Sequence, residues 1–215
     1  MKIAILGGTG PEGSGLGLRW AAHGHEIIIG SRLAEKGQRV ARELKGKCPA
    51  GHIAGTDNLS AAQQAEVVVL AVPYEAQAAT LATVQEALAG KLLITVVAPL
   101  GKPVARVYRL PSGLSAAEEA RQQLGEGARV VAAFQNISAH HLQDLDHEID
   151  CDVLICGDSK ADKELVAGLC ADAGMRGVNA GALQNASVVE GLTAILIGIN
   201  IRHKIKNAGI RVTGI

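Results

Sequence analysis

The chain has 215 residues, of which 48% are hydrophobic and only 2% aromatic, and its formal net charge is zero. This length allows one large domain with a core of aliphatic side chains. A neutral chain lacks the positive field of a general nucleic-acid binder. The four cysteines form no CxxC pair, and no signal-like or membrane-spanning apolar segment is evident. We therefore expect reduced thiols in a cytoplasmic protein without a membrane anchor.

Short apolar segments alternate with helical patterns along most of the chain. Strands are predicted at residues 2–6, 26–29, 53–56, 67–72, 92–97, 129–134, 152–156 and 175–179. Helices are predicted at residues 16–23, 33–45, 61–64, 75–88, 116–124 and 160–171, and from residue 186 onward. Such alternation is typical of βαβ units. We predict an α/β fold with a Rossmann-type doubly wound, mainly parallel sheet and a short C-terminal helical segment.

Two helices carry more specific signals. Ser115, followed three residues later by Glu118, predicts a capping box at the start of the helix at 116–124. The helix after residue 186 is apolar on every side. Such a helix must be buried, either centrally or in a subunit interface.

A glycine-rich turn follows the first predicted strand. Gly8, Gly10 and Gly13 form a G-x-G-x-x-G pattern between a strand and a helix. In this pattern the glycines allow a tight turn, close approach of a pyrophosphate to the backbone, and close packing of helix on strand. The phosphates would bind the positive N-terminal end of the helix. The position of the pattern favours a dinucleotide site over a purely structural turn.

The end of the second strand indicates which dinucleotide is bound. An NAD site carries an acidic residue about 20 residues beyond the glycines, but here the strand ends in Ser31 and Arg32. Lys36 follows four residues later on the same helix face. A hydroxyl and cations suit a 2′-phosphate, which a carboxylate would repel. The alternative is that these side chains form part of a solvated helix face; we predict NADP(H).

The strand ends that face the ligand in such a fold carry few acids and bases. We interpret Tyr74 as a wall of the nicotinamide pocket rather than as a proton donor. His140, His141 and His147 match no spacing of metal ligands, so we expect no metal and assign no catalytic side chain. A site without acid–base groups suits direct hydride transfer between two stacked rings. The basic tail is either an ordinary C-terminus or the binding site of a second anionic ligand.

The chain resembles, nearly from end to end, the family of NADPH-dependent reductases of the deazaflavin coenzyme F420. The segments that carry the resemblance are "KIAILGGTGPEG", "GHEIIIGSRLAEK", "VVLAVPYE", "VVAAFQNISA", "DVLICGD", "NAGALQNASVVEGLT" and "GIRVTGI". The resemblance implies hydride transfer between NADP(H) and coenzyme F420, with small redox cofactors as partners and a homodimer or higher homo-oligomer. We accordingly expect an NADP-binding domain at 1–182, and a C-terminal helix and tail at 183–215 that complete the substrate pocket and a subunit interface.

The resemblance also implies roles for individual residues. The residues expected to bind the nucleotide are Thr9, Gly10, Pro11, Glu12, Ser31, Arg32, Lys36, Val72, Ala76, Ala98, Ala139 and Ala208. The deazaflavin is expected beside Gln135, Asn136 and Ile137.

Several positions depart from the pattern expected of archaeal members. Pro11 and Glu12 stand in place of Asn-Leu, Gln135 in place of His, and Ser187 in place of Arg. Pro11 removes an N–H donor, and Glu12 brings a negative charge near phosphate. The alternatives are an NADP(H)-dependent reductase of another acceptor, such as a flavin or an imino acid, and a non-catalytic NADP sensor.

Overall fold

The computed structural model describes residues 1–125 and 127–215. Its centre is an eight-stranded sheet with the order β3-β2-β1-β4-β5-β6-β7-β8. The strands are β1 (Lys2–Leu6), β2 (Glu26–Ser31), β3 (His52–Asp57), β4 (Val67–Leu70), β5 (Leu92–Thr95), β6 (Arg129–Ala132), β7 (Asp152–Gly157) and β8 (Arg176–Asn179). Pairings from β3 to β6 are parallel, β7 is antiparallel to β6, and β8 is parallel to β7. The predicted Rossmann-type, mainly parallel sheet is confirmed.

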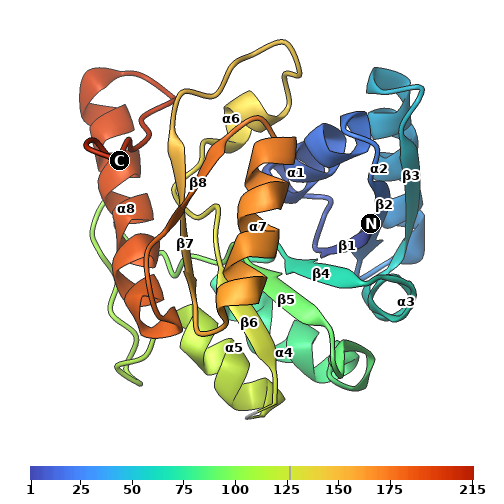
Figure 1. Cartoon of the computed structure of the whole chain (residues 1–215), viewed down its shortest axis with the longest axis horizontal. Helices are drawn as coiled ribbons and strands as arrows, with labels where there is room; N and C mark the ends of the chain where they lie inside the picture. Colours follow the sequence, from blue (N-terminus) through green and yellow to red (C-terminus); the bar gives the residue numbers. More distant parts are fainter. Residues whose placement is uncertain (126) are drawn as a thin grey trace.

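Helices cover both faces of the sheet (Figure 1). They are α1 (Pro11–Ala22), α2 (Ala34–Lys47), α3 (Asn58–Gln64), α4 (Tyr74–Val84), α5 (Ala116–Leu124), α6 (Ala139–Leu142), α7 (Lys160–Asp172) and α8 (Ala186–His203), with short 3-10 turns η1 (Glu86–Leu88) and η2 (Leu183–Asn185). One core contains residues of α1, α2, α6 and α7, and the other contains residues of α3, α4, α5 and α8. Side chains of β1 and β4 enter both cores, because a strand covered on both faces alternates between them.

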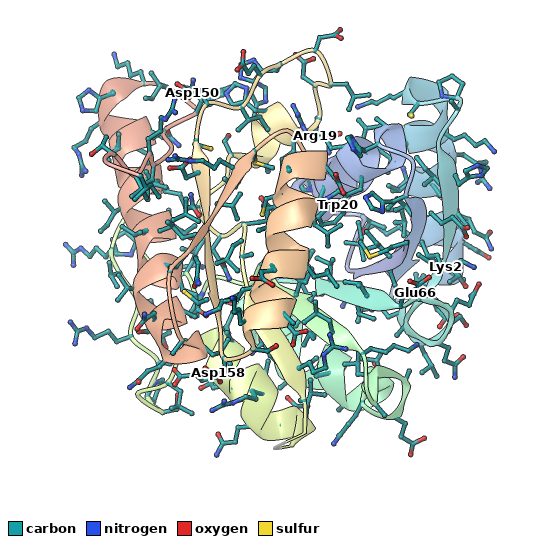
Figure 2. All side chains as sticks on the ribbon, viewed as in Figure 1. Lys2, Arg19, Trp20, Glu66, Asp150 and Asp158 are labelled. Carbon is teal, nitrogen blue, oxygen red and sulfur yellow. The ribbon has the colours of Figure 1, made fainter. Side chains whose placement is uncertain are left out.

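Helix α1 anchors the first core. Arg19 is 7% exposed and donates to the backbone carbonyls of Ala173, His141, Asp144 and His147 at 2.6–3.2 Å. The next residue on α1, the fully buried Trp20, donates to the carbonyl of Leu169 in α7. Figure 2 labels both side chains beside α7. Arg19 therefore ties the segment that begins with α6 to the nucleotide-binding half of the sheet.

Several predicted boundaries were wrong at the carboxyl edge of the sheet. Strands β4, β5 and β6 each end two residues before the predicted position, because the chain there leaves the sheet and enters the loops. Strand β2 is longer than expected, since Ser31 pairs with Asp57 of β3. Helix α1 begins at Pro11 rather than at residue 16, as proline is well suited to the first helical turn. The short α6 and η2 were not predicted.

The other local predictions have mixed outcomes. The capping box of Ser115 and Glu118 is confirmed, and the four cysteines are unpaired. Within the described residues, no helix is long and apolar enough to cross a membrane. Helix α8 is not buried on all sides within the single chain, because Val188 is 67% exposed and Ile195 is 44% exposed. Of the two predicted alternatives, burial in the centre of the fold is therefore wrong.

Candidate nucleotide and hydride-transfer site

The three glycines of the turn serve different purposes. A Cβ on Gly8 would lie 2.7 Å from the carbonyl oxygen of Ile5, and one on Gly13 would lie 2.9 Å from the Cα of Gly8. The protein's own packing therefore requires both glycines. A Cβ on Gly10 would have only the carbonyl oxygen of Gly7 within 4 Å, at 3.8 Å. The packing of the chain therefore does not require glycine at position 10, and the space beside it is not filled by the protein.

The N-terminus of α1 faces this open space. Gly10 is the N-cap residue in an extended conformation, and no side chain caps the helix. The first-turn N–H groups and the positive end of the helix dipole are thus free to meet an anion. Asn58 of α3 stabilises the turn, since its Oδ1 accepts a hydrogen bond from the N–H of Gly7 at 3.2 Å. The predicted glycine turn therefore leads directly into an uncapped helix N-terminus.

The end of β2 lies beside this turn, because the N–H of Gly8 donates to the carbonyl of Gly30 at 3.0 Å. Ser31 is buried, whereas Arg32 and Lys36 are exposed and form no ion pair within the described residues. The carboxylate of Asp57, opposite Ser31 in register, is held by the N–H and hydroxyl of Ser60 at 2.8 and 2.7 Å. These hydrogen bonds lower the pKa of Asp57 and direct its charge toward α3.

A cavity of about 550 Å³ continues from the turn across the carboxyl ends of β4, β5 and β6. It brings together most of the residues that were predicted for the two ligands. These are Gly10, Pro11, Glu12, Val72, Ala98, Gln135, Asn136, Ile137, Ala139 and Ala208. Thr9, Ser31, Arg32, Lys36 and Ala76 do not line the cavity. Ser31, Arg32 and Lys36 belong instead to the end of β2 and the start of α2, as expected for the adenosine end of a dinucleotide.

Two buried amide side chains from the loop after β6 line this cavity. The NH₂ group of Gln135 donates to the carbonyl of Thr95 at 2.9 Å, and that of Asn136 to the carbonyl of Asp152 at 2.7 Å. Both side-chain oxygens are inaccessible and have no hydrogen-bond partner. The two amides are thus fixed in orientation, with their side-chain oxygens buried and unsatisfied.

Helix α8 and the tail close the opposite side of the cavity. Sequence reasoning missed these lining residues, which are Thr193, Leu196, Ile197 and Asn200. The hydroxyl of Thr193 donates to the carbonyl of Gln135 at 2.8 Å. Asn200 Oδ1 accepts the N–H of Ala208 at 2.9 Å and holds the tail against the helix. Thr193 ends one of the segments that carry the resemblance, but nothing in the sequence indicates that it or the other three residues line the cavity.

Two sequence-based interpretations concern residues near this edge. Tyr74 does not form the predicted wall: its hydroxyl donates to Glu119 of α5 at 2.7 Å, so the side chain is directed away from the cavity. The rings of His141 and His147 stack with centroids 3.8 Å apart. No group of three or more potential metal ligands occurs within the described residues.

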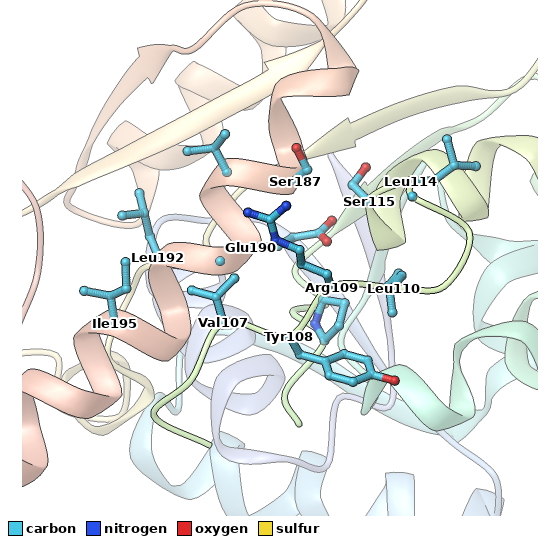
Figure 3. A pocket seen from close by; sticks show the side chains of 14 residues that line it. Val107, Tyr108, Arg109, Leu110, Leu114, Ser115, Ser187, Glu190, Leu192 and Ile195 are labelled. Atoms are coloured by element: carbon cyan, nitrogen blue, oxygen red, sulfur yellow. The ribbon is translucent and has the colours of Figure 1, made fainter. Parts of the chain in front are cut away.

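A second cavity, of about 520 Å³, lies between the loop before α5 and the outer side of α8 (Figure 3). Val107 and Ile195 contribute apolar walls, and Arg109 extends from the loop toward α8. Glu190 accepts the N–H groups of Ala116 and Ala117 at 2.9 and 3.0 Å. Its burial raises the pKa of Glu190 to about 7, although the two hydrogen bonds oppose that effect. Glu190 thus joins α8 to the N-terminus of α5.

The doubly wound sheet and the glycine turn after its first strand define a dinucleotide-binding protein of the Rossmann class. Residues 2–99 match the family model described as "NADP oxidoreductase coenzyme F420-dependent". An F420-dependent NADP reductase of Methanothermobacter marburgensis is 44% identical over 222 residues, covering 100% of this chain and 99% of the relative. Another from Methanocaldococcus jannaschii is 40% identical over 224 residues, with 100% and 99% coverage.

A solved structure from Arthrobacter sp. FB24 superimposes with a TM-score of 0.82 at 27% identity, covering 100% of both chains. The likeness to the curated relatives extends over the whole chain, including α8 and the tail. The chain belongs to the family of coenzyme F420-dependent NADP oxidoreductases.

Proposed function

We propose that this protein transfers a hydride directly between NADP(H) and the deazaflavin coenzyme F420. One observation carries the proposal: a continuous cavity runs from an open glycine turn to two buried amide side chains at the ends of the parallel strands. The full-length similarity to F420-dependent NADP reductases supports this choice of acceptor. When bound, the reduced nicotinamide supplies the hydride, and the deazaflavin accepts it at a ring carbon.

The nucleotide half of the site would use residues of β1, α1, β2 and α2. Thr9, Gly10, Pro11 and Glu12 would surround the pyrophosphate, where the missing side chain of Gly10 leaves room for it. The residues proposed for the 2′-phosphate are Ser31, Arg32 and Lys36, of which the last two are free cations in the described structure. Val72, Ala76, Ala98, Ala139 and Ala208 are proposed along the rest of the nucleotide.

The acceptor half would use the loop after β6. Gln135 and Asn136 line the cavity, and hydrogen bonds to the carbonyls of Thr95 and Asp152 fix both side chains in place. Ile137 is 6% exposed and would pack against the ring system. The lining is mostly apolar, so the contribution of the protein would be to hold two rings in contact. We assign no catalytic acid or base to the hydride transfer itself.

The C-terminal segment has two proposed roles. Residues 183–215 complete the pocket, which is supported by the lining residues of α8 and by Ala208. We also propose that the outer side of α8 joins a second copy of the chain, because Val188, Ile195 and Ile201 are exposed there. Arg202, Lys204 and Lys206 are exposed just beyond Asn200, and we propose that they attract the anionic tail of the second substrate.

A spectral assay tests the proposed function. Protein is mixed with NADPH and oxidised coenzyme F420, and the visible absorbance of the deazaflavin is followed. Loss of that absorbance at a rate proportional to protein concentration supports the proposal. Tight binding of NADPH without turnover of any deazaflavin or flavin would instead indicate an NADP sensor, and turnover of flavin alone would indicate another acceptor.

A further inference from the structure

Glu12 is the carboxyl group that lines the hydride-transfer cavity, and its position is unusual for an acid. It occupies the second position of α1, between the glycine turn and the strand ends. Its Oε1 atom is inaccessible to solvent and has no hydrogen-bond partner. The residue as a whole is only partly buried, and no lysine or arginine among the described residues lines the cavity beside it. Partial desolvation without a cationic partner favours the protonated form of a carboxyl.

Among the described residues of the lining, no lysine or arginine compensates a negative charge on Glu12, and only the positive N-terminal end of α1 favours it. The segments that follow β4 and β5 contribute aliphatic residues to the lining, and the loop after β6 contributes Gln135 and Asn136, which are amides. Helix α8 contributes aliphatic, hydroxyl and amide side chains. The other titratable group of the lining is His140, at the surface of α6. On α1 itself, Arg19 directs its guanidinium to backbone carbonyls two turns away.

The burial of this side chain raises the pKa of Glu12 to about 8, and no neighbouring charge contributes. In the protein without nucleotide, burial therefore favours the neutral carboxyl near pH 7. The two forms of the nucleotide differ in the charge of the nicotinamide ring, which affects the ionisation of a neighbouring carboxyl. The reduced nicotinamide ring is neutral, whereas the oxidised ring carries a positive charge. Both forms share the same pyrophosphate and 2′-phosphate.

We propose that Glu12 determines the relative affinity for oxidised and reduced nucleotide. Its carboxyl is protonated beside the neutral reduced ring and ionises beside the cationic oxidised ring. The O–H bond of Glu12 then breaks, the proton leaves to solvent, and the carboxylate pairs with the ring. This inference rests on the proposed function, because it requires the nicotinamide to lie in this cavity.

Ionisation of Glu12 determines how the affinity for NADP⁺ changes with pH relative to that for NADPH. Below pH 8 a proton must leave Glu12 when NADP⁺ binds, so NADP⁺ binding tightens as the pH rises. NADPH binding requires no such loss. The ratio of the NADP⁺ to the NADPH dissociation constant therefore falls by up to about tenfold per pH unit between pH 6 and pH 8. Protonation of the phosphates affects both nucleotides and cancels in this ratio.

Calorimetry on the purified, unmodified protein tests the proposal without any turnover. NADP⁺ and NADPH are titrated at pH 7 in two buffers of different ionisation enthalpy, which yields the number of protons released by each. We expect NADP⁺ to release close to one proton more than NADPH. Equal proton release by two nucleotides that both bind would overturn the inference and leave the proposed function intact. Failure of both nucleotides to bind would overturn both.

Two variants assign the proton to its source. Glu12→Gln keeps the shape of the side chain and removes the titration, so the extra proton and the pH dependence of the ratio should disappear. His140→Gln removes the other titratable group of the lining and should leave both unchanged. Retention of the extra proton in Glu12→Gln, or its loss in His140→Gln, would contradict the assignment. The comparison of proton release by NADP⁺ and NADPH in the unmodified protein tests the proposal even if Glu12→Gln does not fold.

Discussion

Replacing Gly10 by valine separates the binding role of the turn from its folding role. Gly10 has φ −80° and ψ 165°, which any residue adopts, and an added Cβ would meet nothing closer than 3.8 Å. The change from glycine to a β-branched N-cap costs about 1 kcal/mol, or a fall in Tm of roughly 2–4 °C. The fold should therefore survive, whereas valine at Gly13 would collide with the Cα of Gly8.

The binding loss should be much larger than the stability loss. The valine would occupy the space of the pyrophosphate and break at least two charge-assisted hydrogen bonds to the first turn of α1, each about 1.5–3 kcal/mol. A loss of about 3 kcal/mol or more raises the dissociation constants of both NADPH and NADH more than 100-fold. Titration calorimetry and thermal unfolding measure the two effects. Gly46→Val, at another open glycine in α2, is the matched control. Unchanged affinity in Gly10→Val would refute the placement of the phosphates.

Three further substitutions test other parts of the site. Arg32→Ala should weaken NADPH binding roughly 10- to 100-fold and NADH binding less than about twofold, because only NADPH carries the 2′-phosphate; equal losses for both nucleotides would contradict this role. Arg19→Met leaves four backbone carbonyls without their buried donor and should lower the free energy of unfolding by roughly 3 kcal/mol or more; denaturant unfolding measures it, and a change below about 1 kcal/mol would count against the anchoring role. Ile195→Asp should dissociate the proposed oligomer without lowering Tm by more than a few degrees, which sedimentation velocity would show; an unchanged sedimentation coefficient would argue that the outer side of α8 is not the interface.

Much of the fold could be predicted from the sequence because parallel strands buried on both faces form short, uninterrupted apolar runs. The runs at β1, β4 and β5 are of this kind, and all three strands were found. The start of α1 was missed for a definite reason. Gly13, Gly15 and Gly17 are poor helix formers, so the local sequence does not favour a helix here. A Cβ added at any of the three would lie 3.0 Å or less from a neighbouring atom, so close tertiary packing requires glycine and the helix forms nonetheless.

The site was predictable to the extent that its residues lie in local motifs. The glycine turn and the Ser31–Arg32 pair are such motifs, and the strand ends beyond β4, β5 and β6 follow from the topology. The resemblance implied that the C-terminal helix completes the pocket, but the lining residues of α8 could not be predicted individually, since Thr193 and Asn200 reach the cavity only after the chain crosses to the other end of the sheet. The direction of Tyr74 and the burial of Glu12 also depend on neighbours far away in sequence.

Direct transfer of the hydride between the two rings is the central claim, and isotope transfer tests it most directly. NADPH carrying deuterium on the transferred position of the nicotinamide ring is allowed to reduce coenzyme F420 in ordinary water, and the product is analysed by mass spectrometry. The account predicts that the deuterium appears in the reduced deazaflavin in full. Loss of the deuterium to water, or reduction without any label in the product, would contradict it.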